Sequence, residues 1–189
     1  MKSINLMKSF GSNASFWFAL GLAALLICGC QAKPAPLSPG AVTFKHEIKD
    51  CFSKLAEALK ESVAHRDIPA INAVLEKIES PAVKLCRLCP FKIGILNQYG
   101  EGLASYPPQA VNNMQNYSSY DLVATTINSK KIQHQRFYLQ DGSELYIICA
   151  PLLKDETLIG LIAIAVSSAD ANTKWGLTEK DFMTLNFNN

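Results

Sequence analysis

The sequence is short of the residues that most catalytic and metal sites need. Its 189 residues include three histidines and two tryptophans. No Ser, His and Asp stand in the order of a hydrolase triad, and we find no glycine-rich phosphate loop and no convincing carboxylate pair. His134 has no Cys or carboxylate at ligand spacing, so we expect no metal there. We therefore expect a protein that is not an enzyme and that needs no metal or cofactor.

Surplus charge of either sign is also scarce. The 18 Lys and Arg stand against 16 Asp and Glu, and both surplus cations, Lys2 and Lys8, lie near the N-terminus. From Cys30 onward the chain is balanced, with 16 basic and 16 acidic residues. No basic stripe remains to follow a phosphate backbone, so we expect no nucleic-acid partner.

Long apolar runs are missing as well. The longest, residues 16–27, is too short for a comfortable membrane span, and it follows Lys2 and Lys8 in the layout of a secretory signal. It ends in Ile27-Cys28-Gly29-Cys30, which resembles the lipobox of bacterial lipoproteins. Cys28 departs from that pattern, since a small Ala or Ser is more usual there. An ordinary cleaved signal and an uncleaved anchor remain alternatives.

The lipoprotein resemblance implies a signal peptide over residues 1–29 and a lipid on Cys30, which would be the first residue of the mature chain. Several acyl chains on one residue anchor firmly to a membrane. Residue 31 is Gln, with no Asp there, which by the family's sorting rule slightly favours the outer membrane. Residues 30–42 hold three prolines and should form an extended tether of about 30 Å, at ~3.1 Å per residue. We expect the protein in the cell envelope, facing the periplasm.

Next comes a helical arm. From Phe44 to Val63 the apolar residues recur in steps of three and four, which predicts one buried stripe along a helix. Asp67 is a plausible cap for a second helix, with Pro69 in its first turn. We expect His46 and His65 on this arm to be solvated.

Four cysteines remain after the leader: Cys51, Cys86, Cys89 and Cys149. In an oxidising periplasm they should pair, and four cysteines allow three connectivities. One is redox-like and joins Cys86 to Cys89 and Cys51 to Cys149. The two others tie Cys51 to one member of the Cys86/Cys89 pair. A structural bridge that pins the helical arm to the first strand is the interpretation that the compartment favours.

The rest of the chain predicts a sheet built from hairpins. Two long apolar runs, 144–153 and 158–166, flank a four-residue charged break and form the central hairpin. A second hairpin joins strands at 91–96 and 103–106, and a fifth strand at 132–139 ends in the turn Gln140-Asp141-Gly142-Ser143. With the arm, this predicts an α+β fold whose five-stranded sheet is antiparallel.

The central hairpin, with its Pro151 and its Ile159-Gly160, resembles the last two strands of Cache domains, the PAS-like extracytoplasmic sensors of bacteria. The opening hairpin, with its turn at Asn97 and stop at Pro107, matches how those domains begin their sheet. The resemblance implies a sensor domain over residues 43–189. It also implies a pocket between the sheet and the segment that joins the second and third strands.

Mapped onto this sequence, the resemblance gives six candidate ligand-binding residues: Tyr117, Tyr120, Lys130, Arg136, Tyr138 and Tyr146. Arg136 and Tyr138 share a strand face because side chains alternate along a strand. An Arg beside tyrosines would suit a carboxylate, since its fork donates two parallel hydrogen bonds. The alternative is that Arg136 points to solvent and the tyrosines fill edges of the core.

The tail predicts a helix that begins at Thr178, with Phe182 and Leu185 docking it on the domain. No kinase, cyclase or methyl-accepting segment follows, so we expect a signal to pass to a separate protein. The function we expect is extracytoplasmic binding of a small molecule, with a carboxylate as the candidate ligand. Two alternatives stay open: a thiol redox protein that uses Cys86 and Cys89, and a structural envelope lipoprotein without a ligand.

Overall fold

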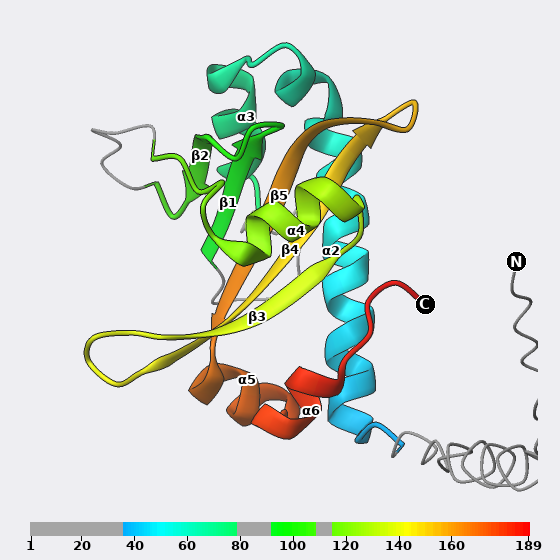
Figure 1. Ribbon diagram of the computed structural model, residues 1–189, viewed down its shortest axis with the longest axis vertical. Helices are drawn as coiled ribbons and strands as arrows, with labels where there is room; N and C mark the ends of the chain where they lie inside the picture. Colours follow the sequence, from blue (N-terminus) through cyan, green and yellow to red (C-terminus); the bar gives the residue numbers. More distant parts are fainter. Residues whose placement is uncertain (1–35, 79–91, 109–114) are drawn as a thin grey trace, which may run out of the picture. The chain divides into compact units, whose positions relative to one another are not determined.

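The computed structural model describes residues 36–78, 92–108 and 115–189. The chain divides into two compact units, Met1–Pro36 and Leu37–Asn189. The second unit contains a five-stranded antiparallel sheet in the order β2-β1-β5-β4-β3 (Figure 1). Its strands are β1 (Lys92–Asn97), β2 (Gly102–Tyr106), β3 (Gln133–Tyr138), β4 (Glu144–Lys154) and β5 (Thr157–Ser167). The predicted fold class is confirmed.

The helical arm is α2 (Pro39–Ala64), a helix of 26 residues. It begins within the predicted tether, because the Ser38 side chain accepts a hydrogen bond from the backbone N–H of Ala41 and Pro39 fits the first turn. Ala41 is already fully buried. The domain therefore includes the last residues of the predicted tether.

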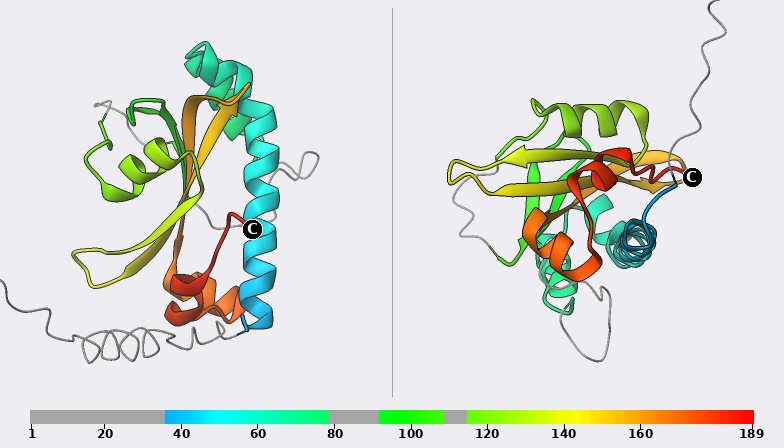
Figure 2. Two further views of the ribbon diagram at one scale, coloured as in Figure 1. Left: turned by 45° about the vertical axis from the view of Figure 1, so that its right-hand side comes forward. Right: turned by 90° about the horizontal axis from the view of Figure 1, so that it is seen from below.

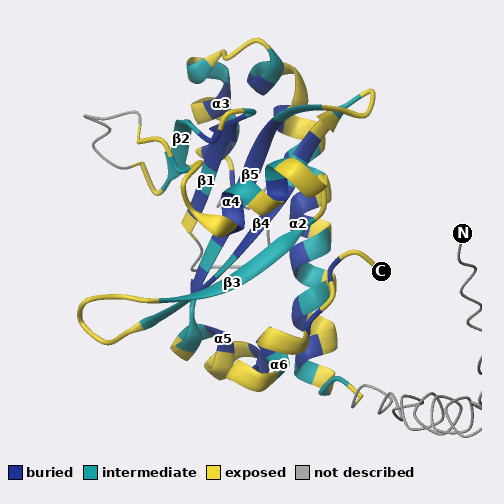
Figure 3. Cartoon of the chain, in the orientation of Figure 1, coloured by how far each residue is buried: buried dark blue, intermediate teal, exposed yellow. Residues whose placement is uncertain are grey.

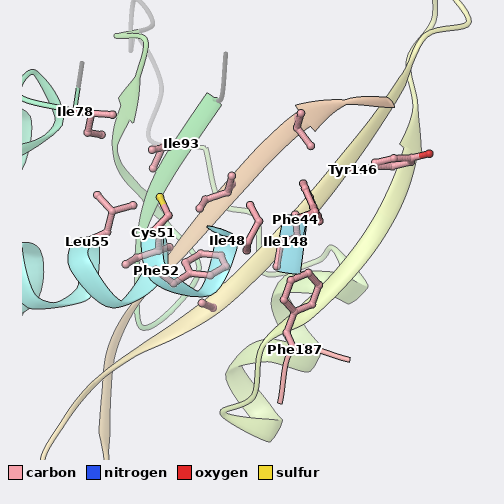
Figure 4. Close-up of a cluster of buried hydrophobic side chains, with 14 of the residues drawn as sticks. Phe44, Ile48, Cys51, Phe52, Leu55, Ile78, Ile93, Tyr146, Ile148 and Phe187 are labelled. Carbon is pink, nitrogen blue, oxygen red and sulfur yellow. The ribbon is translucent and has the colours of Figure 1, made fainter. Parts of the chain in front are cut away.

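The apolar stripe of α2 lies on the sheet, as its period predicts. Figure 4 shows Phe44, Ile48, Phe52 and Leu55 projecting from the helix among side chains of the strands. The second helix, α3 (Ile68–Leu75), is capped by Asp67 as predicted, with the side chain accepting from the N–H of Ala70 at 3.1 Å.

The central hairpin has a tighter turn than predicted. β4 and β5 are paired from Leu145 with Ser167 to Lys154 with Thr157, so only Asp155 and Glu156 form the turn. Both have positive φ, 48° and 64°. Two such residues match the twist of the flanking strands, which explains how 11-residue strands continue to the tip.

Polar side chains fix the other turns. The Asn97 Oδ1 accepts hydrogen bonds from the backbone N–H groups of Tyr99 (2.9 Å) and Glu101 (3.0 Å), as expected for a residue that organises a turn. Asp141 accepts from the N–H and the hydroxyl of Ser143 in the same way, beside Gly142 at φ 81°. These turns set which residues face each side of the sheet.

The two faces of the sheet are covered differently. α2, α3, α5 (Ser168–Trp175) and α6 (Glu179–Thr184) lie on one face, and α4 (Asp121–Ser129) lies on the other (Figure 2). The larger apolar core lies on the α2 face, and a smaller one lies beneath α4. Figure 3 shows the central strands as the most deeply buried part of the sheet.

The helices α4 and α6 begin in different ways. Thr178 caps α6, and it exchanges hydrogen bonds with Asp181 in a capping box, so this predicted start is confirmed. Phe182 and Leu185 are buried as expected. α4 begins differently, because its N-cap residue is Tyr120, which makes no side-chain capping bond. None of the helices in the described ranges is both long and apolar enough to cross a membrane.

Candidate functional site

The face of the sheet beneath α4 carries a cavity of about 690 Å³. Strand alternation places the side chains of β4 residues 145, 147 and 149 on this face, while residues 146 and 148 point to α2. Segment 115–129 covers part of the face and leaves the rest open as the cavity. The described lining residues are Lys92, Ile93, Gly94, Leu96, Gly102, Leu103, Ala104, Ser105, Tyr106, Gln115, Tyr117, Tyr120, Leu122, Val123, Phe137, Leu139, Leu145, Ile147, Cys149, Ala163 and Ala165.

One wall of the cavity is aromatic. The ring centroids of Tyr117 and Tyr120 are 6.1 Å apart, and those of Tyr120 and Phe137 are 6.3 Å apart. The planes are tilted by 43° and 54°, so none of these rings covers the face of another. The row joins the connecting segment to β3.

Backbone contacts hold the aromatic segment against the first hairpin. The Tyr117 N–H donates to the carbonyl of Gly100 at 2.8 Å, and the Gly102 N–H donates to the carbonyl of Gln115 at 3.1 Å. Gly100 has φ 81°, and a Cβ on it would lie 3.0 Å from the backbone nitrogen of Ser118. Only glycine combines that φ with so close an approach at low cost. Tyr117 is therefore positioned by the turn after β1.

The floor of the cavity continues into the smaller core. Cys149 is fully buried on β4 and belongs to the cluster of Leu96, Leu122, Val123 and Leu161. Burial raises the pKa of the Cys149 thiol to about 12, although the side chain of Thr126 on α4 lowers it to a smaller extent. This thiol is protonated at neutral pH and acts as a small apolar group.

Of the six predicted ligand-binding residues, Tyr117 and Tyr120 line the cavity. Arg136, Tyr138 and Tyr146 do share a face, but it is the opposite one, which the helices cover. Arg136 forms an ion pair with Glu179 of α6, and its guanidinium lies 4.7 Å from the centroid of the Tyr138 ring. The placement of Arg136 and Tyr138 in the pocket is wrong, because the face that the helices take depends on packing outside β3.

Tyr146 and Lys130 also make contacts within the protein in place of the predicted contacts with a ligand. Tyr146 is 2% exposed and stacks on Phe182 in the core beneath α6. Lys130 ends α4 with φ 51°, and its Nζ donates to the carbonyl of Glu156 in the β4–β5 turn at 3.0 Å. Neither residue lines the cavity, so both assignments are wrong for this pocket.

The sequence interpretation missed the strand residues of the cavity, chiefly Gly94, Phe137, Ile147, Ala163 and Ala165. Phe137 could have been found, because it alternates with Arg136 and Tyr138 and faces the other side. The small residues carry little signal on their own. β4 and β5 are apolar at nearly every position, so alternation does not assign their faces.

The cysteines depart from the predicted complete pairing. Cys51 is a disulfide cysteine, whereas Cys149 is a free thiol. Every connectivity that pairs all four residues needs Cys149, so the prediction of two disulfides among them is wrong. The sheet explains the difference: Cys51 lies in the core on the α2 face, and Cys149 lies on the α4 face. Cys86 and Cys89 fall outside the described residues, as does Cys30.

The chemistry of the lining is apolar with few polar groups. Of its described residues, Lys92 alone carries a charge, while Ser105, Gln115 and the three tyrosines carry hydrogen-bonding groups. Within residues 36–78, 92–108 and 115–189, no three His, Cys, Asp or Glu side chains lie close enough together to hold a metal ion. An apolar concave surface with a few polar groups is typical of a small-molecule site.

No protein-family model matches the chain, and no curated protein matches it. Several solved structures do match the chain. An extracellular ligand-binding receptor from Desulfohalobium retbaense is 12% identical, with a TM-score of 0.53, over 71% of this chain and 25% of that one. The sensor domain of the histidine kinase DctB from V. cholerae is 13% identical, with a TM-score of 0.49, over 86% of this chain and 57% of that one.

A third match is the ligand-binding domain of the Pseudomonas fluorescens chemoreceptor CtaA in complex with L-isoleucine. It is 12% identical, with a TM-score of 0.49, and the match covers 69% of this chain and 52% of that one. The chain thus spans between a quarter and three fifths of the length of these structures. The likeness to the Desulfohalobium receptor shows that the chain shares the fold of that structure over 71% of its length.

Proposed function

We propose that the chain binds a small molecule in the cavity beneath α4 and acts as a sensor-type domain on the outer side of the cytoplasmic membrane. The observation that carries this proposal is the cavity itself. Its volume of about 690 Å³ falls within the roughly 300–1,000 Å³ of small-molecule sites. Its partly exposed apolar lining, which includes Phe137 and Ile147, gives a ligand surface to bury.

The two sides of the cavity differ in rigidity, so ligand binding could change the conformation of segment 115–129. The floor is a five-stranded sheet backed by the larger core. Most of the wall, with Tyr117 and Tyr120, belongs to segment 115–129, where Tyr120 is 44% exposed. A ligand between them would hold the segment on the sheet, and the shift in population is limited by its differential affinity for the two states. We propose that the resulting signal passes to a separate protein and that no catalysis is involved.

We propose that a signal peptide precedes Cys30 and that Cys30 carries a lipid, which places the domain in the cell envelope. We also propose that a disulfide at Cys51 holds α2 to the segment before β1. A bridge of that kind would stabilise the domain by limiting the unfolded chain. A carboxylate ligand has weak support at this cavity. Arg136 pairs with Glu179 on the far face of the sheet, which leaves Lys92 as the described cation at the cavity.

The test is native mass spectrometry of the full chain purified from the cell envelope of an expression host. We expect a non-covalent small molecule on the wild-type protein and on Arg136→Gln. We expect it to be lost from Ala163→Leu, because the larger side chain occupies the cavity. Equal occupancy in both variants would place the molecule elsewhere. No bound molecule, together with no change in Tm across a library of metabolites, would contradict the proposal.

A further inference from the structure

The floor of the cavity is a shelf of small side chains. On β5, Ala163 is paired with Gly94 of β1 on one side and with Cys149 of β4 on the other. Neighbouring strands lie about 4.8 Å apart, so this row extends for about 10 Å without a long side chain. Ala165 adds a second small residue further along β5, between Lys92 and Ile147.

Space is open above the Gly94 and Ala163 part of this shelf, whereas Cys149 at its end lies beneath α4. A Cβ built on Gly94 would meet one described atom beyond its chain neighbours within 4 Å, the Cβ of Ala163, at an ordinary contact distance of 3.9 Å. Ala163 and Ala165 are only half-buried although they lie on the central strand of the sheet. A flat floor of this kind accepts a flat molecule, because no long side chain stands between the molecule and the strands.

The wall above the floor consists of the rings of Tyr117, Tyr120 and Phe137. These rings are tilted against one another and none of them is fully buried, so a further ring can contact their edges or faces. Aromatic rings attract other rings through offset and edge-to-face contacts, beyond the area that they bury. Shelf and wall therefore favour the same ligand shape.

The charge of the lining residues narrows the class of ligand. The described lining residues include the cation Lys92 but neither Asp nor Glu. An ammonium group in this cavity would lose its water without gaining a counter-charge, which is costly. A ligand with a free amino group is thus disfavoured.

We infer that the cavity binds a planar aromatic molecule that carries no ammonium group, held between the Gly94–Ala163–Cys149 shelf and the Tyr117–Tyr120–Phe137 wall. The inference rests on the proposed function, because it names the ligand class of the same cavity. It departs from the carboxylate or amino-acid ligand that an arginine in the pocket would have served.

Indole and tryptamine test the inference by calorimetric titration of the full chain. They share a bicyclic ring, and only tryptamine carries an ammonium group. We expect saturable binding of indole and at least tenfold weaker binding of tryptamine. Tyr117→Phe should retain the affinity for indole, whereas Tyr117→Leu, which removes the ring, should weaken it at least tenfold.

Cavity-filling variants locate the site. Ala163→Leu should weaken indole binding at least tenfold, and Gly94→Ala, which fits without a clash, should weaken it measurably while the Tm of the free protein stays unchanged. Ala169→Leu is the matched control, because Ala169 is exposed on α5 and lies outside the lining. It should bind indole as the wild-type protein does.

The outcomes separate the inference from the proposed function. A bound amino acid or dicarboxylate that Ala163→Leu displaces, without indole binding, would overturn the aromatic class and leave the sensor function standing. Indole binding that Ala163→Leu and Gly94→Ala leave unchanged would also overturn the inference. If the chain binds neither indole nor any co-purified molecule, both proposals fail.

Discussion

The rings of Tyr146 and Phe182 are stacked, with centroids 4.1 Å apart and planes only 8° apart. Tyr146 lies near the start of β4 on its α2 face, and Phe182 lies on α6, so the contact joins the end of the chain to the sheet. The ring of Phe182 also meets His134 of β3 edge-on, at 5.1 Å. A six-residue helix has little stability by itself, so α6 depends on this packing.

Phe182→Ala should lower the free energy of unfolding by about 3–5 kcal/mol, the usual cost of removing a buried phenylalanine ring. Phe182 is fully buried, which makes partial relaxation difficult. Urea unfolding followed by circular dichroism measures the change. Met183→Ala is the control: Met183 is 52% exposed, and its loss should stay within about 0.5 kcal/mol. A loss below 1 kcal/mol for Phe182→Ala would mean that α6 is not held by this ring.

His134 should make stability depend on pH. Burial lowers the pKa of His134, and hydrogen bonds with the backbone of Met183 and Phe182 oppose this in part. In the unfolded chain the imidazole keeps its ordinary pKa of about 6.5. Below that pH the unfolded state binds more protons than the folded state, so the stabilisation is complete above about pH 6.5 and is lost as the pH falls toward the folded pKa. The charged groups on the same face include Arg136 and Glu179.

The measurement is the free energy of unfolding at pH 7.5, 6.5 and 5.5. We expect the wild-type value to fall across this range and the fall to be smaller in His134→Gln, which cannot take up a proton. Carboxyl groups with a lowered pKa, such as Asp181, titrate below this range. His46→Gln, at an exposed position on α2, should keep the wild-type slope. Equal slopes in the wild-type protein and His134→Gln would contradict the assignment.

The fold could be predicted because its signals are local. The stripe on α2, the Asp67 cap, the Asn97 turn and the Asp141 turn each follow from a few neighbouring residues. The site could not be predicted in the same way. Arg136, Tyr138 and Tyr146 share a face as expected, but whether α4 or α6 covers that face depends on how distant segments pack.

The cysteines illustrate the same limit. A count of four cysteines in an oxidising compartment favours complete pairing, but it carries no information on the sheet face of each thiol. Cys149 lies on β4 beneath α4, whereas Cys51 lies on α2, in the core on the opposite face of the sheet. Tyr117 and Tyr120 were identified because the family resemblance places the connecting segment over the pocket, which no periodicity in that segment shows.

Two glycines on paired strands should respond differently to a methyl group. In Gly160→Ala the new Cβ would lie 2.6 Å from the carbonyl oxygen of Leu96 and 2.7 Å from a methyl carbon of Val63. Overpacking of this kind costs about 1–3 kcal/mol. Gly94→Ala meets only an ordinary contact at 3.9 Å and should stay within about 0.5 kcal/mol of the wild type. Urea unfolding of both variants provides the comparison, and equal losses would refute the close packing of α2 and β1 at Gly160.

The thiol of Cys149 should be unreactive toward alkylating reagents in the folded protein. Its side chain is fully buried and burial raises the pKa of its thiol to about 12, so the reactive thiolate is almost absent at pH 8. After a brief exposure to iodoacetamide, we expect peptide mass spectrometry to find no adduct on Cys149 in the native protein and complete modification in 6 M guanidinium chloride. Cys149→Ala removes the peptide adduct and serves as the control.

Reactivity of Cys149 also reports on the wall of the cavity, because α4 and Thr126 lie above it. If segment 115–129 opens locally, labelling of Cys149 in the native protein should be slow and should be suppressed by indole, whose binding holds the segment on the sheet. Rapid labelling that indole does not slow would show that the thiol is reached from another side, and it would contradict both the burial of Cys149 and its place on the cavity floor.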